Sequence, residues 1–127
     1  MKETAFYACD QCKVLIEKIS GRNEDFSCGG KALKKLEANT SEGAKEKHLP
    51  VVEQNGSQIT VKVGSVFHPM TEEHSIEWVY LETERGGQRM MLRPDEEPVA
   101  VFALAHGDRA VAAYAYCNLH GFWKTQL

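Results

Sequence analysis

Apolar and polar residues alternate along much of the chain after Pro50, which is the pattern expected of half-buried β-strands. The alternation is clearest over residues 59–63, where isoleucine or valine occupies every second position. The dipeptide Asn55-Gly56 precedes this run, and Asn-Gly between two strand-like runs is a strong hairpin signal. We therefore predict a β-hairpin in which residues 51–54 pair with residues 57–63.

Turn residues divide the rest of this region into further short runs with strand character. These runs are residues 76–82, residues 88–93 after Gly86-Gly87, residues 99–105, and residues 110–116 after His106-Gly107-Asp108. Residues 88–93 are expected to return after Gly86-Gly87 as the partner of residues 76–82. The last two runs predict a hairpin, with His106 at the surface in its turn. About seven short strands with intervening turns favour an all-β fold, an antiparallel sandwich or barrel. Only residues 30–38, with Leu33 and Leu36 on one side, predict a short helix.

The character of the sequence changes near residues 40–45. A cysteine-containing segment precedes the polar stretch 37–44, and strand-like runs follow it. We therefore predict two domains, a small N-terminal module over residues 1–38 and a larger β-domain over residues 39–127.

Composition and charge limit the classes of function. The chain has 127 residues, of which 43% are hydrophobic and 26% charged, as in ordinary globular proteins. A net charge of -3 gives no electrostatic reason to expect a nucleic-acid partner. No apolar run is long enough to span a membrane, and the N-terminus lacks the apolar segment of a signal peptide. We expect a cytoplasmic protein whose cysteines are ligands or free thiols rather than disulfides.

The candidate chemistry lies in one cysteine and four histidines. Cys117 and His120 stand three residues apart at the end of an apolar run, and His48, His68 and His74 lie upstream. Imidazole suits iron, zinc, copper or nickel. Tetrahedral zinc is complete with four ligands, so five ligands favour a five-coordinate ion with one open position, and iron fits that count. A thiolate opposite the open position would push electron density toward a bound oxygen species.

Each of these residues also has an ordinary structural explanation. A single histidine in a β-protein is more often a hydrogen-bonded surface or core residue, and a cysteine after an apolar run is often a small buried hydrophobe. The prediction of a metal site therefore depends on all five residues together and on their flanking sequences.

The flanking sequences resemble a known family. The runs Glu46-Lys47-His48-Leu49-Pro50, residues 68–74 and residues 117–123 resemble the iron-binding motifs of superoxide reductases of the desulfoferrodoxin family, in order and spacing over residues 44–127. The resemblance implies an immunoglobulin-like β-sandwich that holds one mononuclear non-haem iron. It implies four equatorial imidazoles and an axial thiolate, supplied by His48, His68, His74, His120 and Cys117.

The same resemblance implies a reaction and its partners. Superoxide would be reduced by one electron to hydrogen peroxide, and a rubredoxin-like protein would donate the electron. Lys47 would attract the superoxide anion and help to deliver protons, and Glu46 would occupy the sixth position of the oxidised iron. The resemblance also implies a homodimer. The ordinary alternative for Glu46 and Lys47 is a solvated charged pair.

The N-terminal cysteines form an incomplete pattern. Cys9, Cys12 and Cys28 resemble the desulforedoxin-type module of the same family, whose iron is held by four thiolates. That module ends in two adjacent cysteines, whereas Gly29 follows Cys28 here. With three thiolates in one chain we expect no second iron centre. The three residues could bind zinc or iron weakly, form one disulfide on oxidation, or belong to a module that folds without metal.

Two other classes of function stay open. An iron-binding electron-transfer protein would use the same five ligands without turning over superoxide, and it would need no cation such as Lys47 at an open position. A purely structural interaction domain would hold its histidines incidentally. In that case substitution of Cys117 or His68 would leave the metal content unchanged.

Overall fold

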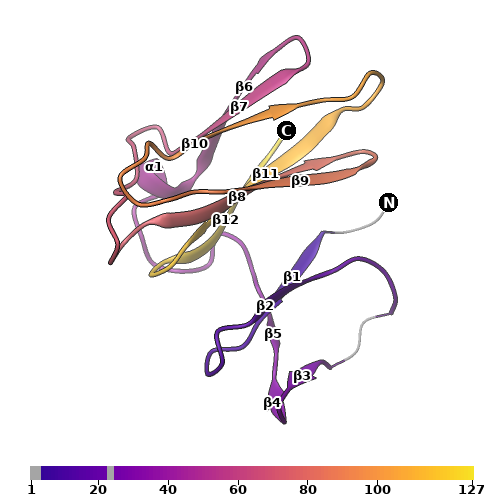
Figure 1. The fold of residues 1–127 in the computed structure, drawn as a ribbon, viewed down its shortest axis with the longest axis vertical. Helices are drawn as coiled ribbons and strands as arrows, with labels where there is room; N and C mark the ends of the chain where they lie inside the picture. The colour runs from indigo at the N-terminus through magenta and orange to yellow at the C-terminus, as the bar shows by residue number, and fades with distance from the viewer. Residues whose placement is uncertain (1–3, 23–24) are drawn as a thin grey trace. The chain divides into compact units, whose positions relative to one another are not determined.

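The computed structural model describes residues 4–22 and 25–127, and nearly all of their regular secondary structure is antiparallel β-strand (Figure 1). Contacts between residues divide the chain into two compact units, Met1–Glu37 and Ala38–Leu127. Within the described ranges, no helix is long and apolar enough to cross a membrane.

The described residues of the N-terminal unit form five short strands. Three of them form a sheet in the order β2-β1-β5, and the other two form a hairpin. The strands are β1 (Ala5–Ala8), β2 (Leu15–Lys18), β3 (Ser27–Cys28), β4 (Lys31–Ala32) and β5 (Lys34–Lys35).

The short helix predicted over residues 30–38 is wrong. Residues 31–32 belong to the β3–β4 hairpin, and residues 34–35 pair with β1. Gly29 and Gly30 both have positive φ, so the chain turns there, and a helix of so few residues is marginal without tertiary support. Pairing of residues 34–35 with β1 therefore outweighs the weak helical signal from the spacing of Leu33 and Leu36.

The C-terminal unit is a sandwich of two antiparallel sheets, which confirms the all-β, immunoglobulin-like fold (Figure 1). One sheet has the strand order β10-β7-β6, and the other has the order β12-β11-β8-β9. One helical turn, α1 (Lys45–His48), precedes the strands. The strands are β6 (Pro50–Asn55), β7 (Gln58–Val63), β8 (Ile76–Thr83), β9 (Gly86–Met91), β10 (Val99–Ala103), β11 (Ala110–Cys117) and β12 (Gly121–Gln126).

Two local predictions in this unit are confirmed and one is wrong. The Asn55-Gly56 hairpin joins β6 to β7, and the strand after Gly86-Gly87 pairs with β8. The hairpin predicted at residues 106–108 does not form, because β10 pairs with β7 whereas β11 pairs with β8 and β12. The connection instead crosses from one sheet to the other, and His106 is exposed in it, as predicted.

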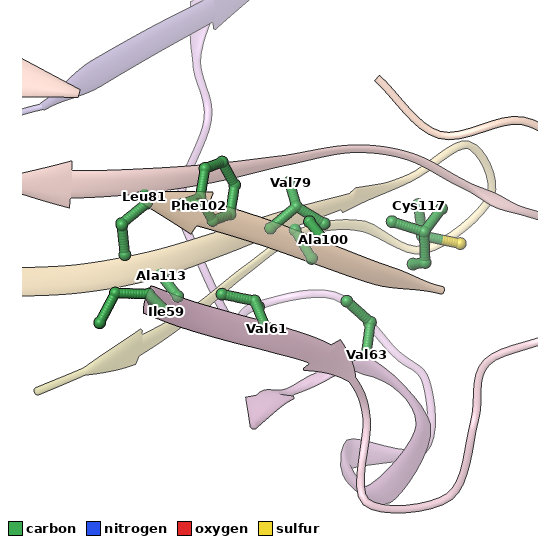
Figure 2. Packing of buried hydrophobic residues seen from close by; sticks show 11 residues of the cluster. Ile59, Val61, Val63, Val79, Leu81, Ala100, Phe102, Ala113 and Cys117 are labelled. Carbon is green, nitrogen blue, oxygen red and sulfur yellow. The ribbon is translucent and has the colours of Figure 1, made fainter. Parts of the chain in front are cut away.

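The core lies between the two sheets. Every second residue of β7, namely Ile59, Val61 and Val63, is fully buried, as the sequence alternation predicts. These side chains pack with apolar residues of the facing sheet (Figure 2). Burying one such side chain stabilises the fold by about 1.5–3 kcal/mol. Cys117 lies at one end of this cluster, and its sulfur points away from the other labelled residues (Figure 2).

Candidate metal centre

Five potential ligands converge at the end of the sandwich where β11 stops. They come from α1, from the connection between β7 and β8, from the last residue of β11 and from the β11–β12 turn. Their ligand atoms all lie within 4.8 Å of one another. Within the described part of the chain, this is the only group of three or more such side chains: His48, His68, His74, Cys117 and His120.

Backbone contacts bring α1 to the β7–β8 connection. The carbonyl of Glu46 accepts hydrogen bonds from the Val66 N–H at 2.9 Å and from the Ser65 hydroxyl at 3.2 Å. A side chain at Gly64 would place its Cβ 2.5 Å from that carbonyl oxygen, so the close approach requires glycine. His48 at the end of α1 thereby meets His68 of the connection.

The distances between ligand atoms fit a single metal ion. His48 Nε2 lies 3.1 Å from His68 Nε2 and 3.2 Å from His120 Nδ1. Cys117 Sγ lies 3.4 Å from His68 Nε2 and 4.0 Å from His120 Nδ1. Two nitrogens bound to one ion at about 2.1 Å and at right angles would lie about 3 Å apart. The nitrogen separations in this cluster agree with that value.

Hydrogen bonds orient two of the imidazoles. His48 Nδ1 lies 2.7 Å from the Ala44 carbonyl, and His68 Nδ1 lies 2.6 Å from the Pro69 carbonyl. A carbonyl can only accept, so each Nδ1 carries the proton and each Nε2 presents its lone pair to the cluster. Such outer contacts commonly hold metal-binding histidines in place.

His74 provides the most direct indication of a ligand. Its Nε2 atom is buried and has no hydrogen-bond partner. Leaving a buried polar atom unpaired costs about 1–3 kcal/mol. A metal ion among the five donor atoms would satisfy this nitrogen, so the residues present fit the iron that the sequence resemblance implies.

Burial sets the protonation states of the cluster. Burial is the largest cause of the lowered pKa of His48, His74 and His68, and it lowers the pKa of His68 to about 4. These imidazoles are therefore neutral near pH 7, which is the form that binds metals. Burial also raises the pKa of the Cys117 thiol, against the hydrogen bonds from the backbone N–H groups of His120 and Leu119. A bound cation would reverse that effect by stabilising the thiolate.

Asn118 connects two of the ligand-bearing segments. Its side chain accepts a hydrogen bond from the Ser75 N–H at 3.0 Å and donates one to the Glu73 carbonyl at 2.8 Å. Its own N–H donates to the Ser75 carbonyl at 3.2 Å. These three bonds tie the segment around His74 to the turn that follows Cys117.

Trp123 and Gly43 support the imidazoles of His48 and His120. The Trp123 ring stacks on His48 with centroids 4.8 Å apart, and its Nε1–H donates to the His120 carbonyl at 3.1 Å. Ser41 donates to the same carbonyl. A Cβ at Gly43 would lie 3.1 Å from the His48 ring and 3.3 Å from the His120 ring. Sequence reasoning missed these roles, although Asn118 and Trp123 lie within the run 117–123 that carried the resemblance.

The remaining predicted site residues lie outside the cluster. Glu46 and Lys47 are exposed on α1. The charge of Lys47 nevertheless contributes to the lowered pKa of both His48 and His74, so it acts on the cluster. Cys9 is buried, Cys12 exposed and Cys28 half-buried, and none of the three forms a disulfide.

Known proteins are similar to this chain in sequence and fold. The desulfoferrodoxin family model matches residues 40–126. A desulfoferrodoxin homolog of Archaeoglobus fulgidus is 41% identical over 119 residues, which cover 94% of each chain. The crystal structure of the superoxide reductase from Treponema pallidum is similar with a TM-score of 0.84 and 41% identity, over 98% of this chain and 100% of that one.

A shorter protein also matches. The superoxide reductase (1Fe-SOR) from Giardia intestinalis is 32% identical with a TM-score of 0.56, and the match covers 65% of this chain and 98% of that one. Because the family model spans more than half of the sequence and full-length relatives share its fold, this chain belongs to the desulfoferrodoxin family.

Proposed function

We propose that this protein is a non-haem iron superoxide reductase. The observation that carries the proposal is the convergence of four imidazoles and one thiol, with His74 Nε2 buried and otherwise unpaired. The similar solved structures from Treponema pallidum and Giardia intestinalis are superoxide reductases, which supports an oxidoreductase of this kind. The ligands would be His48, His68, His74, His120 and Cys117, and they would hold one iron per chain.

The reaction needs one electron and two protons for each superoxide, giving one hydrogen peroxide. Iron bound by these five residues would supply the electron. The four imidazoles and the Cys117 thiolate would hold the cation, while Asn118 and Trp123 keep their segments in place. A fixed arrangement of this kind lowers the reorganisation required at the reacting centre.

Lys47 is the residue we propose to attract the substrate. Superoxide is a small anion, and a cation near the reacting centre raises its local concentration and its rate of encounter. Lys47 is exposed, one residue before His48, and its charge reaches His48 and His74. It could also bring protons from solvent to the developing peroxide. Glu46, on the same helical turn, is our candidate for a further ligand that would bind the iron after oxidation.

The partners follow from the same proposal. Each turnover leaves the site one electron short, so an external donor is required, and we propose a rubredoxin-like protein. We also propose a homodimer in a reducing, cytoplasmic compartment. An electron carrier without superoxide turnover is the alternative function, and the presence of Lys47 beside the cluster favours the reductase.

Two measurements test the proposal. Elemental analysis of anaerobically purified protein should give close to one iron per chain, and superoxide generated by pulse radiolysis should be consumed rapidly by the reduced protein. Lys47→Ala should slow this bimolecular step by roughly tenfold or more at low ionic strength. Lys45→Ala, an exposed lysine on the same turn, is the matched control and should have a smaller effect. Reduced iron protein that leaves superoxide unconsumed would contradict the reductase and favour the carrier.

A further inference from the structure

Two cysteines of the N-terminal unit lie in one tight turn. The Cys12 N–H donates to Cys9 Sγ at 3.3 Å, so the sulfur of Cys9 lies against the backbone of Cys12. The turn is closed by the Lys13 N–H, which donates to the Cys9 carbonyl at 3.0 Å, and by the Cys9 N–H, which donates to the Val14 carbonyl at 2.9 Å. Lys13 accommodates the reversal with a φ of 64°.

The three N-terminal thiols are one short of a four-thiolate metal site. Gly29 follows Cys28, so one chain offers three thiolates where a tetrahedral site needs four. Among the described residues, Cys9, Cys12 and Cys28 form no group of converging ligand atoms, and none of them is in a disulfide. The turn therefore contains a Cys-x-x-Cys pair that is not part of a complete metal site.

Access to the two sulfurs is unequal. Cys12 is exposed, whereas Cys9 is only 3% exposed. An oxidant from solvent would therefore reach Cys12 first, and Cys9 would be the neighbouring thiol that resolves the product. A disulfide requires Cα atoms about 4.4–6.8 Å apart. Residues three apart in a tight turn are held within about 7 Å, so the pair can be bridged with little movement.

We propose that Cys9 and Cys12 form a peroxide-sensitive dithiol that closes to a disulfide within the turn. The Cys12 sulfur attacks one oxygen of hydrogen peroxide, the O–O bond breaks, and Cys12 becomes a sulfenic acid as one water leaves. The Cys9 sulfur then attacks the Cys12 sulfur, the S–S bond forms, and a second water leaves. Two electrons pass from the two thiols to one peroxide. The inference rests on the proposed function only in that superoxide reduction would produce peroxide in the same molecule.

The experiment supplies peroxide directly to the full-length, iron-loaded protein. After treatment, free thiols are alkylated and the chain is cut with trypsin. Cleavage after Lys2 and Lys13 puts both cysteines in one peptide, residues 3–13, whereas Cys28 and Cys117 fall in residues 23–31 and 110–124. We expect the peptide 3–13 to lose two hydrogens and to resist alkylation, and dithiothreitol to restore both thiols.

Two variants separate this pair from the other cysteines. Cys12→Ser, at an exposed position, should leave Cys9 open to alkylation after peroxide and unfolding. Cys28→Ser should leave the disulfide in peptide 3–13 unchanged. A cross-link between peptides 3–13 and 23–31, or overoxidised Cys12 beside a free Cys9, would overturn the proposal, as would thiols protected by a bound metal. Because peroxide is added, failure of superoxide turnover would count against the proposed function without affecting this result.

Discussion

Asn118 lies between two proposed ligands in the sequence, and its side chain joins two ligand-bearing segments in space. Asn118→Ala would remove both side-chain bonds and release the segment around His74. Contacts that orient metal ligands typically contribute about 10–100-fold to metal affinity, and we expect a loss of that size. Competition with an iron chelator measures it.

Gln126→Ala is the matched control for Asn118→Ala. The Gln126 side chain also donates to a backbone carbonyl, that of Val111, but at the opposite end of β12. Its removal should leave iron affinity unchanged. Equal losses in the two variants would indicate a general effect on the fold rather than a role of Asn118 in positioning His74.

Gly43 is the second residue whose importance depends on its neighbours. Its φ is 150°, and an added Cβ would press on the rings of His48 and His120. An alanine there would displace the two ligand rings, and changes to groups that position metal ligands typically cost about 10–100-fold in affinity, so Gly43→Ala should weaken iron binding by roughly tenfold. Gly86→Ala is the control, because its Cβ would meet nothing within 4 Å. Iron titration of both variants, with circular dichroism to verify folding, tests this expectation.

At the scale of the elements, the carboxylate of Asp108 accepts hydrogen bonds that fix the connection between β10 and β11. Asp108 accepts hydrogen bonds from the N–H groups of Arg109 at 2.8 Å and Arg85 at 3.2 Å. A hydrogen bond with the Thr83 side chain is the largest cause of its lowered pKa. The carboxylate therefore links the crossover between the sheets to the β8–β9 hairpin.

The lowered pKa gives a pH dependence with a definite sign. The folded-state pKa of Asp108 lies below its ordinary value of 3.8. The carboxylate therefore stabilises the fold above that value, and the contribution is lost as the pH falls through the folded pKa. Asp108→Asn should be less stable than the natural chain at pH 6 in urea unfolding, and the difference should shrink toward pH 3. A difference that grows as the pH falls would contradict this assignment.

The elements also show where sequence patterns are sufficient and where they are not. The β6–β7 hairpin could be predicted because Asn55-Gly56 fixes the turn locally and the alternation fixes the buried face. The strands β10 and β11 could be recognised in the sequence, but their pairing partners could not, because both are apolar runs. In the structure β10 pairs with β7 and β11 pairs with β8. Residues 31–35 were misassigned because their structure depends on pairing with β1 and on the turn at Gly29 and Gly30.

At the scale of the whole molecule, all five proposed ligands belong to the unit Ala38–Leu127. Residues 38–127 produced alone should therefore bind as much iron per chain as the full-length protein. The N-terminal cysteines should add no second iron and no visible absorption of a four-thiolate ferric centre. Elemental analysis and visible spectra of the two chains test this directly. More iron in the full chain, together with that spectrum, would show that the first unit completes a metal site of its own.

The amino-acid sequence by itself determined the β-class of the larger unit, two of its hairpins and the identity of the five converging side chains. These features depend on local alternation, on turn chemistry and on residue types whose spacing is characteristic. The tertiary structure decided which nitrogen of His48 and His68 faces the cluster, and which residues hold the ligands in place. Asn118, Trp123 and Gly43 act through neighbours up to 77 positions away, as His120 is from Gly43. No local pattern can encode contacts of that kind, because they exist only when the ends of the strands have come together.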